Sequence, residues 1–208
     1  MGPKIIFATG NMGKMREIRG ILGDTGMEIL SIKEAGIDAD IVEDGTTFTE
    51  NALIKAKAVA GLLAQHASDA YADAIVLADD SGLEIDALNK EPGIYSARYL
   101  GEDTPYSVKN AHLIERLSGV PDEKRTARFV CAIAAVMPTG EEITTLGVIE
   151  GRIGYKEEGD NGFGYDPIFY VPEYGCTTAQ LTEDEKNKIS HRGKALNAMK
   201  EELRKRIS

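Results

Sequence analysis

The chain has 208 residues, of which 42% are hydrophobic and 28% are charged, so it can form one large globular domain or two small ones. Its formal net charge of -10 argues against duplex nucleic acid or an anionic membrane as the main partner. The two cysteines have neither disulfide-framework nor metal-knuckle spacing, and no apolar run approaches the roughly 20 residues of a membrane span. We therefore expect a cytoplasmic protein that is neither secreted nor inserted in a membrane.

The first predicted unit is a strand, a glycine-containing turn and a helix. Lys4–Ala8 is a short apolar run, and Thr9–Lys14 separates it from an apolar spacing typical of a helix. Free backbone N–H groups at such a helix start can bind a phosphate, although the spacing of a P-loop is absent. An ordinary turn, in which Asn11 caps the helix and Lys14 is solvated, would explain the same pattern.

A second strand and a long helix come next. Glu28–Ile32 has the composition of a strand. Thr47 and Glu50 have capping-box spacing, which predicts a helix that starts there and reaches about Gln65. Much of the apolar face of this helix should come from four residues: Leu53, Val59, Leu62 and Leu63.

Two adjacent acids stand out near the middle of the chain. The apolar run Ala74–Leu77 leads to Asp79 and Asp80, which we expect at the exposed end of a buried strand. Adjacent carboxylates repel each other, so a divalent metal or a raised pKa is the functional interpretation. An Asx-type turn before Gly82 explains the pattern equally well. The alternating segment Leu83–Leu88 predicts a separate short strand.

A loop with aromatic and basic residues leads into the next predicted helix. Thr104 and Pro105 have the order of an N-cap and a first helical residue, and the helix should reach about Leu117. Arg98, in the loop before it, can contact an anion or pair with one of the local acids.

The second half of the chain begins with a predicted hairpin and continues in a glycine-rich segment. The β-type runs Thr126–Met137 and Glu141–Gly151 predict an antiparallel pair, so the sheet should be mixed. Residues 151–174 then combine glycines with aromatic residues such as Phe163 and Tyr165. Close backbone approach and aromatic stacking would suit a base-binding loop. The alternative is a connection whose aromatic rings fill the core.

Two helices are predicted at the end of the chain. Thr182–Glu185 has capping-box spacing, and Ser190 is a plausible cap for a second helix. The apolar face of that second helix should consist of Ala195, Leu196, Met199 and Leu203. His191 and Arg192 would lie at its N-terminus, where the helix dipole disfavours cations but where a polar ligand can be held.

Four stretches, taken in order, resemble one known family. They are Thr9–Lys14, Ala78–Leu83, Gly162–Pro167 and Ser190–Leu196. Together they are similar to the motifs of the Ham1-like family of non-canonical purine nucleoside triphosphate pyrophosphatases, the inosine triphosphatase group. The resemblance covers essentially the whole chain. It implies an α/β fold with a mixed, strongly twisted central sheet flanked by helices, in a single domain of residues 1–208 with two lobes and the active site in the cleft between them.

The resemblance also implies an activity, a cofactor and a site. The enzyme would hydrolyse ITP, dITP and XTP to the monophosphate and pyrophosphate with Mg2+, as a homodimer. Asp80 would be the general base and a metal ligand, and Glu43, or its neighbour Asp44, the second metal acid. The implied substrate-binding residues are Thr9, Gly10, Asn11, Met12, Gly13, Lys14, Lys55, Ser81, Phe163, Gly164, Tyr165, Asp166, Lys186, His191 and Arg192.

Individual roles follow from the same resemblance. Lys14 would compensate charge where pyrophosphate leaves, and Phe163 would stack on the purine. Donors at His191 and Arg192 would bind the 6-keto oxygen of hypoxanthine or xanthine, which adenine lacks. A Maf-type pyrophosphatase is the alternative enzyme, and a nucleotide-binding module without turnover is the alternative class. The extra acids beside Asp80 argue against a pure triphosphate binder.

Overall fold

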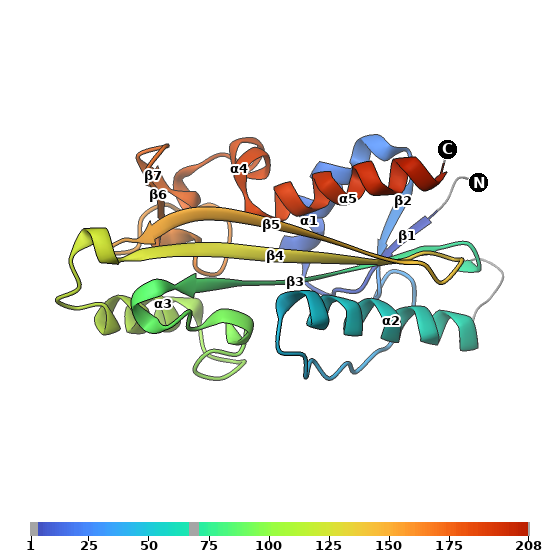
Figure 1. The fold of residues 1–208 in the computed structure, drawn as a ribbon, viewed down its shortest axis with the longest axis horizontal. Coiled ribbons are helices and arrows are strands. Elements are labelled where there is room, and N and C mark those ends of the chain that lie inside the picture. Colours follow the sequence, from blue (N-terminus) through green and yellow to red (C-terminus); the bar gives the residue numbers. More distant parts are fainter. Residues whose placement is uncertain (1–3, 67–70, 208) are drawn as a thin grey trace. The chain divides into compact units, whose positions relative to one another are not determined.

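The computed structural model describes residues 4–66 and 71–207. Within them a mixed sheet of seven strands has the order β2-β1-β3-β4-β5-β6-β7 (Figure 1). Strand β1 is parallel to β2 and β3, whereas β6 is antiparallel to β5 and β7. The predicted mixed α/β fold is therefore confirmed, while the expected cleft stays a prediction.

The strands and helices have the following bounds. The strands are β1 Lys4–Phe7, β2 Glu28–Ser31, β3 Ile75–Ile85, β4 Thr126–Val136, β5 Glu142–Ile153, β6 Phe169–Val171 and β7 Cys176–Thr177. The α-helices are α1 Met12–Leu22, α2 Phe48–His66, α3 Tyr106–Arg116, α4 Glu183–Ile189 and α5 His191–Ile207. None of these helices, within the part of the chain that the structure describes, has the length and apolar character of a membrane span.

The chain divides into two compact units, and three strands contribute to both. The first unit consists of Met1–Asp80, Cys131–Gly147 and Arg192–Ser208, and the second of Ser81–Val130 and Val148–His191. The boundary therefore crosses β3, β4 and β5. The expectation of a single domain with two lobes stays a prediction.

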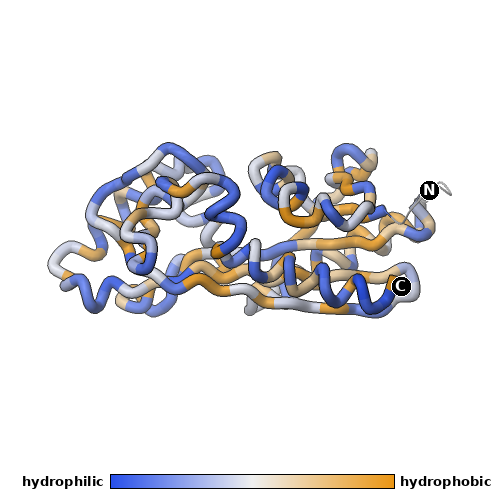
Figure 2. Tube along the Cα trace, turned by 90° about the horizontal axis from the view of Figure 1, so that it is seen from above, coloured by the Kyte–Doolittle hydropathy of each residue, from blue (hydrophilic) through white to orange (hydrophobic). Residues whose placement is uncertain are grey.

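The core of the first unit lies between its strands and the helices α1 and α5. Its fully buried residues include Ile5 and Phe7 of β1, Leu77 of β3, Ile18 of α1 and Met199 of α5. All four apolar positions predicted for the last helix are buried, as expected for an amphipathic helix. Figure 2 shows the strands as mainly hydrophobic, whereas hydrophilic residues interrupt the helices.

Helix α2 belongs to the first unit, and its buried face differs in part from the one predicted. Its buried positions are Phe48, Asn51, Ala52, Lys55, Ala56 and Val59. Of the four predicted apolar positions Val59 is buried and the three leucines are half-buried, so the predicted face is confirmed only in part. These buried positions follow spacings of three and four, which share a face of a helix, and they include two polar side chains, Asn51 and Lys55.

The core of the second unit packs around the other ends of the long strands. It includes Leu83 and Ile85 of β3, Phe129 of β4, Ile153 of β5 and Phe169 of β6. Close packing requires a glycine at residue 151 of β5, because a Cβ there would lie 2.5 Å from the carbonyl oxygen of Tyr170. The glycine found there has no such atom. Strands β6 and β7 were missed by the sequence analysis.

Strand β3 corrects three sequence-based expectations. It runs without a break for 11 residues, so Asp79 and Asp80 lie inside the strand and not at its exposed end. An Asx-type turn is excluded by the same geometry. Residues 83–85 belong to this strand, and Asp86–Leu88 is a 3-10 turn, so the separate strand expected at Leu83–Leu88 was also wrong.

The helix caps were predicted better than the middle of β3. Thr47 accepts from the backbone of Glu50, and Thr182 and Glu185 form a complete capping box at α4. Helix α3, however, has Pro105 as its N-cap, and the Thr104 hydroxyl donates to the carbonyl of Leu100. Thr104 is therefore not the cap.

Candidate active site

The turn between β1 and α1 is held by its own polar side chains. The Asn11 side chain caps α1 by accepting from the backbone of Gly13 at 2.9 Å and of Lys14 at 3.1 Å. The Thr9 hydroxyl accepts from the backbone of Asn11 at 3.2 Å. Gly10 and Met12 are exposed. The Asn11 cap is the one expected for an ordinary turn. Lys14 is not solvated as expected for that turn, because it pairs with Asp79.

Lys14 and Arg192 meet on the same buried carboxylate of Asp79. Lys14 Nζ lies 3.0 Å from both oxygens of Asp79, and Arg192 Nη2 lies 3.1 Å from Oδ2. The Arg192 guanidinium also pairs with Glu17. Burial alone would raise the pKa of Asp79, but the charges of Lys14 and Arg192 outweigh it and hold that pKa well below its usual range. Asp79 is thus a buried carboxylate that stays ionised.

Asp80, the next residue of β3, has different surroundings. Asn51 Nδ2 donates to Asp80 Oδ2 at 3.1 Å, and Lys55 Nζ faces Oδ1 at 3.8 Å. The same ammonium lies 2.9 Å from Glu43 Oε2. Burial raises the pKa of Asp80 above its usual value and the charge of Glu43 adds to this, while Lys55 and the Asn51 hydrogen bond act in the opposite direction. A buried acid with a raised pKa is suited to taking up a proton.

Glu43 and Asp80 are the acids that the sequence led us to expect as metal ligands. Among the described residues, no group of three or more His, Cys, Asp or Glu side chains gathers as at an all-protein metal site. Two carboxylates are nevertheless enough for Mg2+, which completes its shell with water and substrate phosphates. Lys55, a cation, already faces both acids. Asp44 is exposed whereas Glu43 is half-buried, which favours Glu43 over its neighbour.

In the second unit, the hydrogen bonds of one carboxylate hold the loop that carries Phe163. Asp166 Oδ2 accepts from the backbone of Phe163 at 2.8 Å and from Lys186 Nζ at 2.7 Å, and Oδ1 accepts from Thr178 Oγ1 at 2.8 Å. A Cβ at Gly162, whose φ is +75°, would lie 2.3 Å from Asp166 Oδ2. The loop therefore needs both the glycine and the acid.

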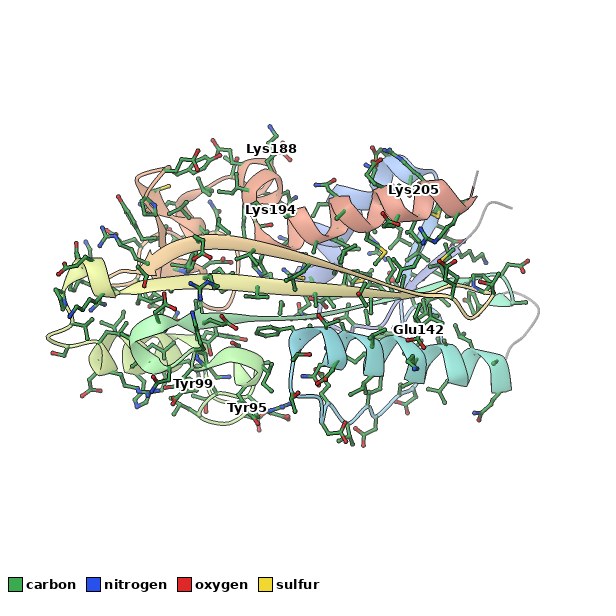
Figure 3. The ribbon with its side chains drawn as sticks, in the orientation of Figure 1. Tyr95, Tyr99, Glu142, Lys188, Lys194 and Lys205 are labelled. Atoms are coloured by element: carbon green, nitrogen blue, oxygen red, sulfur yellow. The ribbon has the colours of Figure 1, made fainter. Side chains whose placement is uncertain are left out.

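Phe163 and Tyr165, two residues apart, have different environments. Phe163 is half-buried, and Lys186 Nζ lies 5.0 Å from its ring centroid. Lys186 is buried, whereas Lys188 on the same helix points outward in Figure 3. Tyr165 is buried, and its hydroxyl donates to the carbonyl of Ser96 at 2.7 Å. Tyr165 thus fills the core, as the alternative interpretation of this segment expected.

The remaining predicted site residues are distributed as follows. Gly164 has a φ of +70°, and a Cβ there would lie 3.5 Å from the Tyr106 ring. Ser81 follows Asp80 in β3 and is half-buried. His191 is buried and stacks on Phe129 with 4.8 Å between ring centroids. Arg98 lies over the Tyr95 ring at 4.9 Å.

Three residues of these clusters were missed by the sequence analysis: Asn51, Glu17 and Thr178. Asn51 lies four residues before Lys55, so helical spacing alone would have placed both on one face of α2. Glu17 lies three residues after Lys14 and shares a face of α1 with it. Thr178 had no comparable signal, because its contact with Asp166 joins two loops.

Comparison with known proteins gives one consistent result. Residues 5–202 match the Ham1 family. A dITP/XTP pyrophosphatase of Clostridium perfringens is 50% identical over 201 residues, covering 97% of each chain, and one of Exiguobacterium sibiricum is 46% identical over 200 residues, covering 96% of each. Among solved structures, the Ham1 protein of Staphylococcus aureus has a TM-score of 0.83 and 40% identity, and the alignment covers 98% of this chain and 99% of that one. A HAM1 protein of Coxiella burnetii has the same TM-score and coverage at 38% identity.

Proposed function

The chain belongs to the Ham1 family, and on that premise we propose that it hydrolyses the non-canonical purine nucleoside triphosphates dITP, XTP and ITP to monophosphate and pyrophosphate. Its relatives at 50% and 46% identity carry the name dITP/XTP pyrophosphatase. The observation that carries the proposal is Asp80, a buried carboxylate with a raised pKa, held on both oxygens and accompanied by a second acid.

The turn Thr9–Lys14 binds the triphosphate in this proposal. It opens α1, so the positive end of the helix dipole lies there, and Gly10 and Met12 leave the backbone accessible. Lys14 adds a full positive charge, and its ion pair with Asp79 holds the ammonium group in place. That charge compensates the negative charge that develops on the departing pyrophosphate.

Asp80 is the general base. It takes a proton from a water molecule while the water oxygen bonds to the α-phosphorus, and the bond from that phosphorus to the bridging oxygen breaks, so pyrophosphate leaves. Lys55, which faces Asp80 Oδ1, supports the ionised state of this carboxylate. The nearby Asp79 is committed to Lys14 and Arg192, which favours Asp80 for this task.

We assign Mg2+ to the pair of Glu43 and Asp80. Oxygen ligands suit this hard cation, and the ammonium of Lys55 between the two acids supports a local demand for positive charge. When bound, the metal would neutralise phosphate charge and acidify a coordinated water.

The loop around Phe163 recognises the base. The half-buried ring can stack on a purine, and the segment Gly164–Asp166 forms the wall beside it. His191 and Arg192 are the proposed donors to the 6-keto oxygen, and Ser81 contacts the nucleotide. The ion pairs of Arg192 with Asp79 and Glu17 favour an additional role for it in holding Asp79.

We also propose a cytoplasmic homodimer, which a sedimentation run at micromolar concentration would test.

The test is pyrophosphate release from dITP, XTP, ITP, GTP and ATP, with Mg2+ and with chelator. We expect the first three to be cleaved much faster than GTP and ATP, and only with the metal. Asp80→Asn should lower kcat by about 100-fold to 10,000-fold, since it removes the base. Asp103→Asn, at an exposed position, is the matched control and should keep the wild-type rate. Full activity of the Asp80 variant would contradict the assignment of Asp80 as the general base.

A further inference from the structure

A buried amide contacts the carboxylate that we propose as the general base. Asn51, in the first turn of α2, is fully buried, and its Nδ2 donates to Asp80 Oδ2 at 3.1 Å. A buried side-chain amide is costly unless its donors and its acceptor are satisfied. Its partners therefore show what it does.

The orientation of this amide is fixed by a glycine. The backbone N–H of Gly45 donates to Asn51 Oδ1 at 2.9 Å. A backbone N–H can only donate, so the amide oxygen must face Gly45 and the NH2 group must face Asp80. The hydrogen bond to Asp80 thus has a defined donor and a defined acceptor.

Gly45 also leaves no room for a side chain. A Cβ there would lie 2.6 Å from Asn51 Oδ1 and 2.8 Å from the Cβ of Glu50. Any larger residue would push against the amide that faces Asp80. The glycine is required here by close approach to Asn51.

Asn51 and Lys55 hold the two oxygens of Asp80 separately. They are four residues apart on α2 and so lie on the same face of the helix. Asn51 contacts Oδ2 and Lys55 faces Oδ1. Lys55 also pairs with Glu43, which belongs to the same loop as Gly45. Two side chains of one helix turn therefore contact the Asp80 carboxylate, and the preceding loop holds both of those side chains.

From this geometry we infer that Asn51, supported by Gly45, is a positioning residue that fixes the plane of the Asp80 carboxylate and directs its Oδ1 toward Lys55. The inference rests on the proposed hydrolysis. A base must meet the water from a defined direction, and a misplacement of about 1 Å costs roughly 100-fold in rate. Asn51 touches no substrate atom in this role, so it acts on kcat and not on KM.

The test compares Asn51→Ala and Asn51→Asp with the wild type, using dITP. We expect kcat to fall about 100-fold in both, with KM within about threefold. Asn51→Asp keeps the shape and the bond from Gly45 but turns an oxygen toward Asp80, so its loss should be at least as large. Asn197→Asp makes the same change at an exposed position of α5 and should keep the wild-type kcat.

A double-substitution cycle separates positioning from folding. In the Asp80→Asn background, Asn51→Ala should lower the residual rate by less than about threefold, because the group it positions is gone. Gly45→Ala, which displaces the amide without removing it, should lower kcat at least tenfold. A similar loss from Asn51→Ala in both backgrounds, or unchanged kcat in both Asn51 variants, overturns the inference alone. A wild type that releases no pyrophosphate overturns the proposed function and the inference with it.

Discussion

Asp79 and Asp80 are neighbours in one strand, yet their carboxyl groups have opposite electrostatic environments. Asp79 lies between Lys14 and Arg192, and the pKa of its carboxyl is lowered despite burial. Asp80 has a more distant ammonium and a second acid nearby, and burial raises its pKa. A pair of acids whose pKa values are pushed apart is typical of sites that use one for charge and one for proton transfer.

We predict different effects on stability for the same substitution at these two residues. Asp79→Asn should lower the free energy of unfolding by about 3–5 kcal/mol, because it removes the carboxylate that Lys14 shares with the buried Arg192, which is left with Glu17 alone. The folded-state pKa of Asp79 is lowered, so its contribution is fully present above the unfolded value of 3.8 and is lost as pH falls below it. The loss should therefore be equal at pH 6, 7 and 8.

Asp80→Asn should leave stability unchanged or raise it, because a buried carboxyl with a raised pKa is destabilised when ionised. Urea unfolding of both variants at the three pH values checks the pair. A loss below about 1 kcal/mol for Asp79→Asn, or one that varies between pH 6 and pH 8, would contradict the ion-pair account.

Among the elements, the loop Gly162–Asp166 is held by the side chain of one residue, Asp166. Asp166 accepts from Phe163, Lys186 and Thr178, so it joins three separate segments of the second unit. Its carboxylate is buried with these donors around it. The hydrogen bonds that Asp166 accepts therefore hold the backbone that carries the Phe163 ring.

Gly162→Ala should disturb this loop and raise KM for dITP by about tenfold or more. The new Cβ would lie 2.3 Å from Asp166 Oδ2, at a φ of +75°. Gly175→Ala is the matched control, since its φ is +65° but its Cβ would meet nothing closer than 3.9 Å. Both variants carry the backbone cost of about 1–2 kcal/mol, which thermal unfolding measures. Equal KM values for the two variants would show that the contact with Asp166 does not set the loop.

At the scale of the whole molecule, the described residues form two hydrophobic cores built on shared strands. Strand β3 supplies Ile75 and Leu77 to the first core, and Leu83 and Ile85 to the second. Unfolding one core alone would require a strand to detach over half of its length. The two cores should therefore unfold together.

We predict one urea transition that both cores control. Met199→Ala in the first core and Phe169→Ala in the second should each lower the free energy of unfolding, by about 2–5 and 3–5 kcal/mol. Val108→Ala, at a half-exposed side chain of α3, should change it by less than about 0.5 kcal/mol. Circular dichroism and tyrosine fluorescence should give the same midpoint for every variant. Two transitions, each sensitive to only one of the core variants, would contradict this coupling.

Local features of this protein could be predicted from the order of its residues alone. Apolar runs indicated β1, β4 and β5, and capping-box spacing located the starts of α2 and α4, because these signals depend on residues within a few positions of each other. The ordered motifs also identified the Ham1 family, which the match over residues 5–202 confirms.

The difference between the two adjacent acids, and the partners that hold each one, could not be predicted without the folded structure. Lys14 lies 65 positions from Asp79, Asn51 lies 29 from Asp80, and Arg192 lies 113 from Asp79. Neither helical nor strand periodicity reaches across such separations. The partners that keep one carboxylate charged and orient the other are brought together by packing of α1, α2 and α5 on β3, and burial then sets the strength of each interaction.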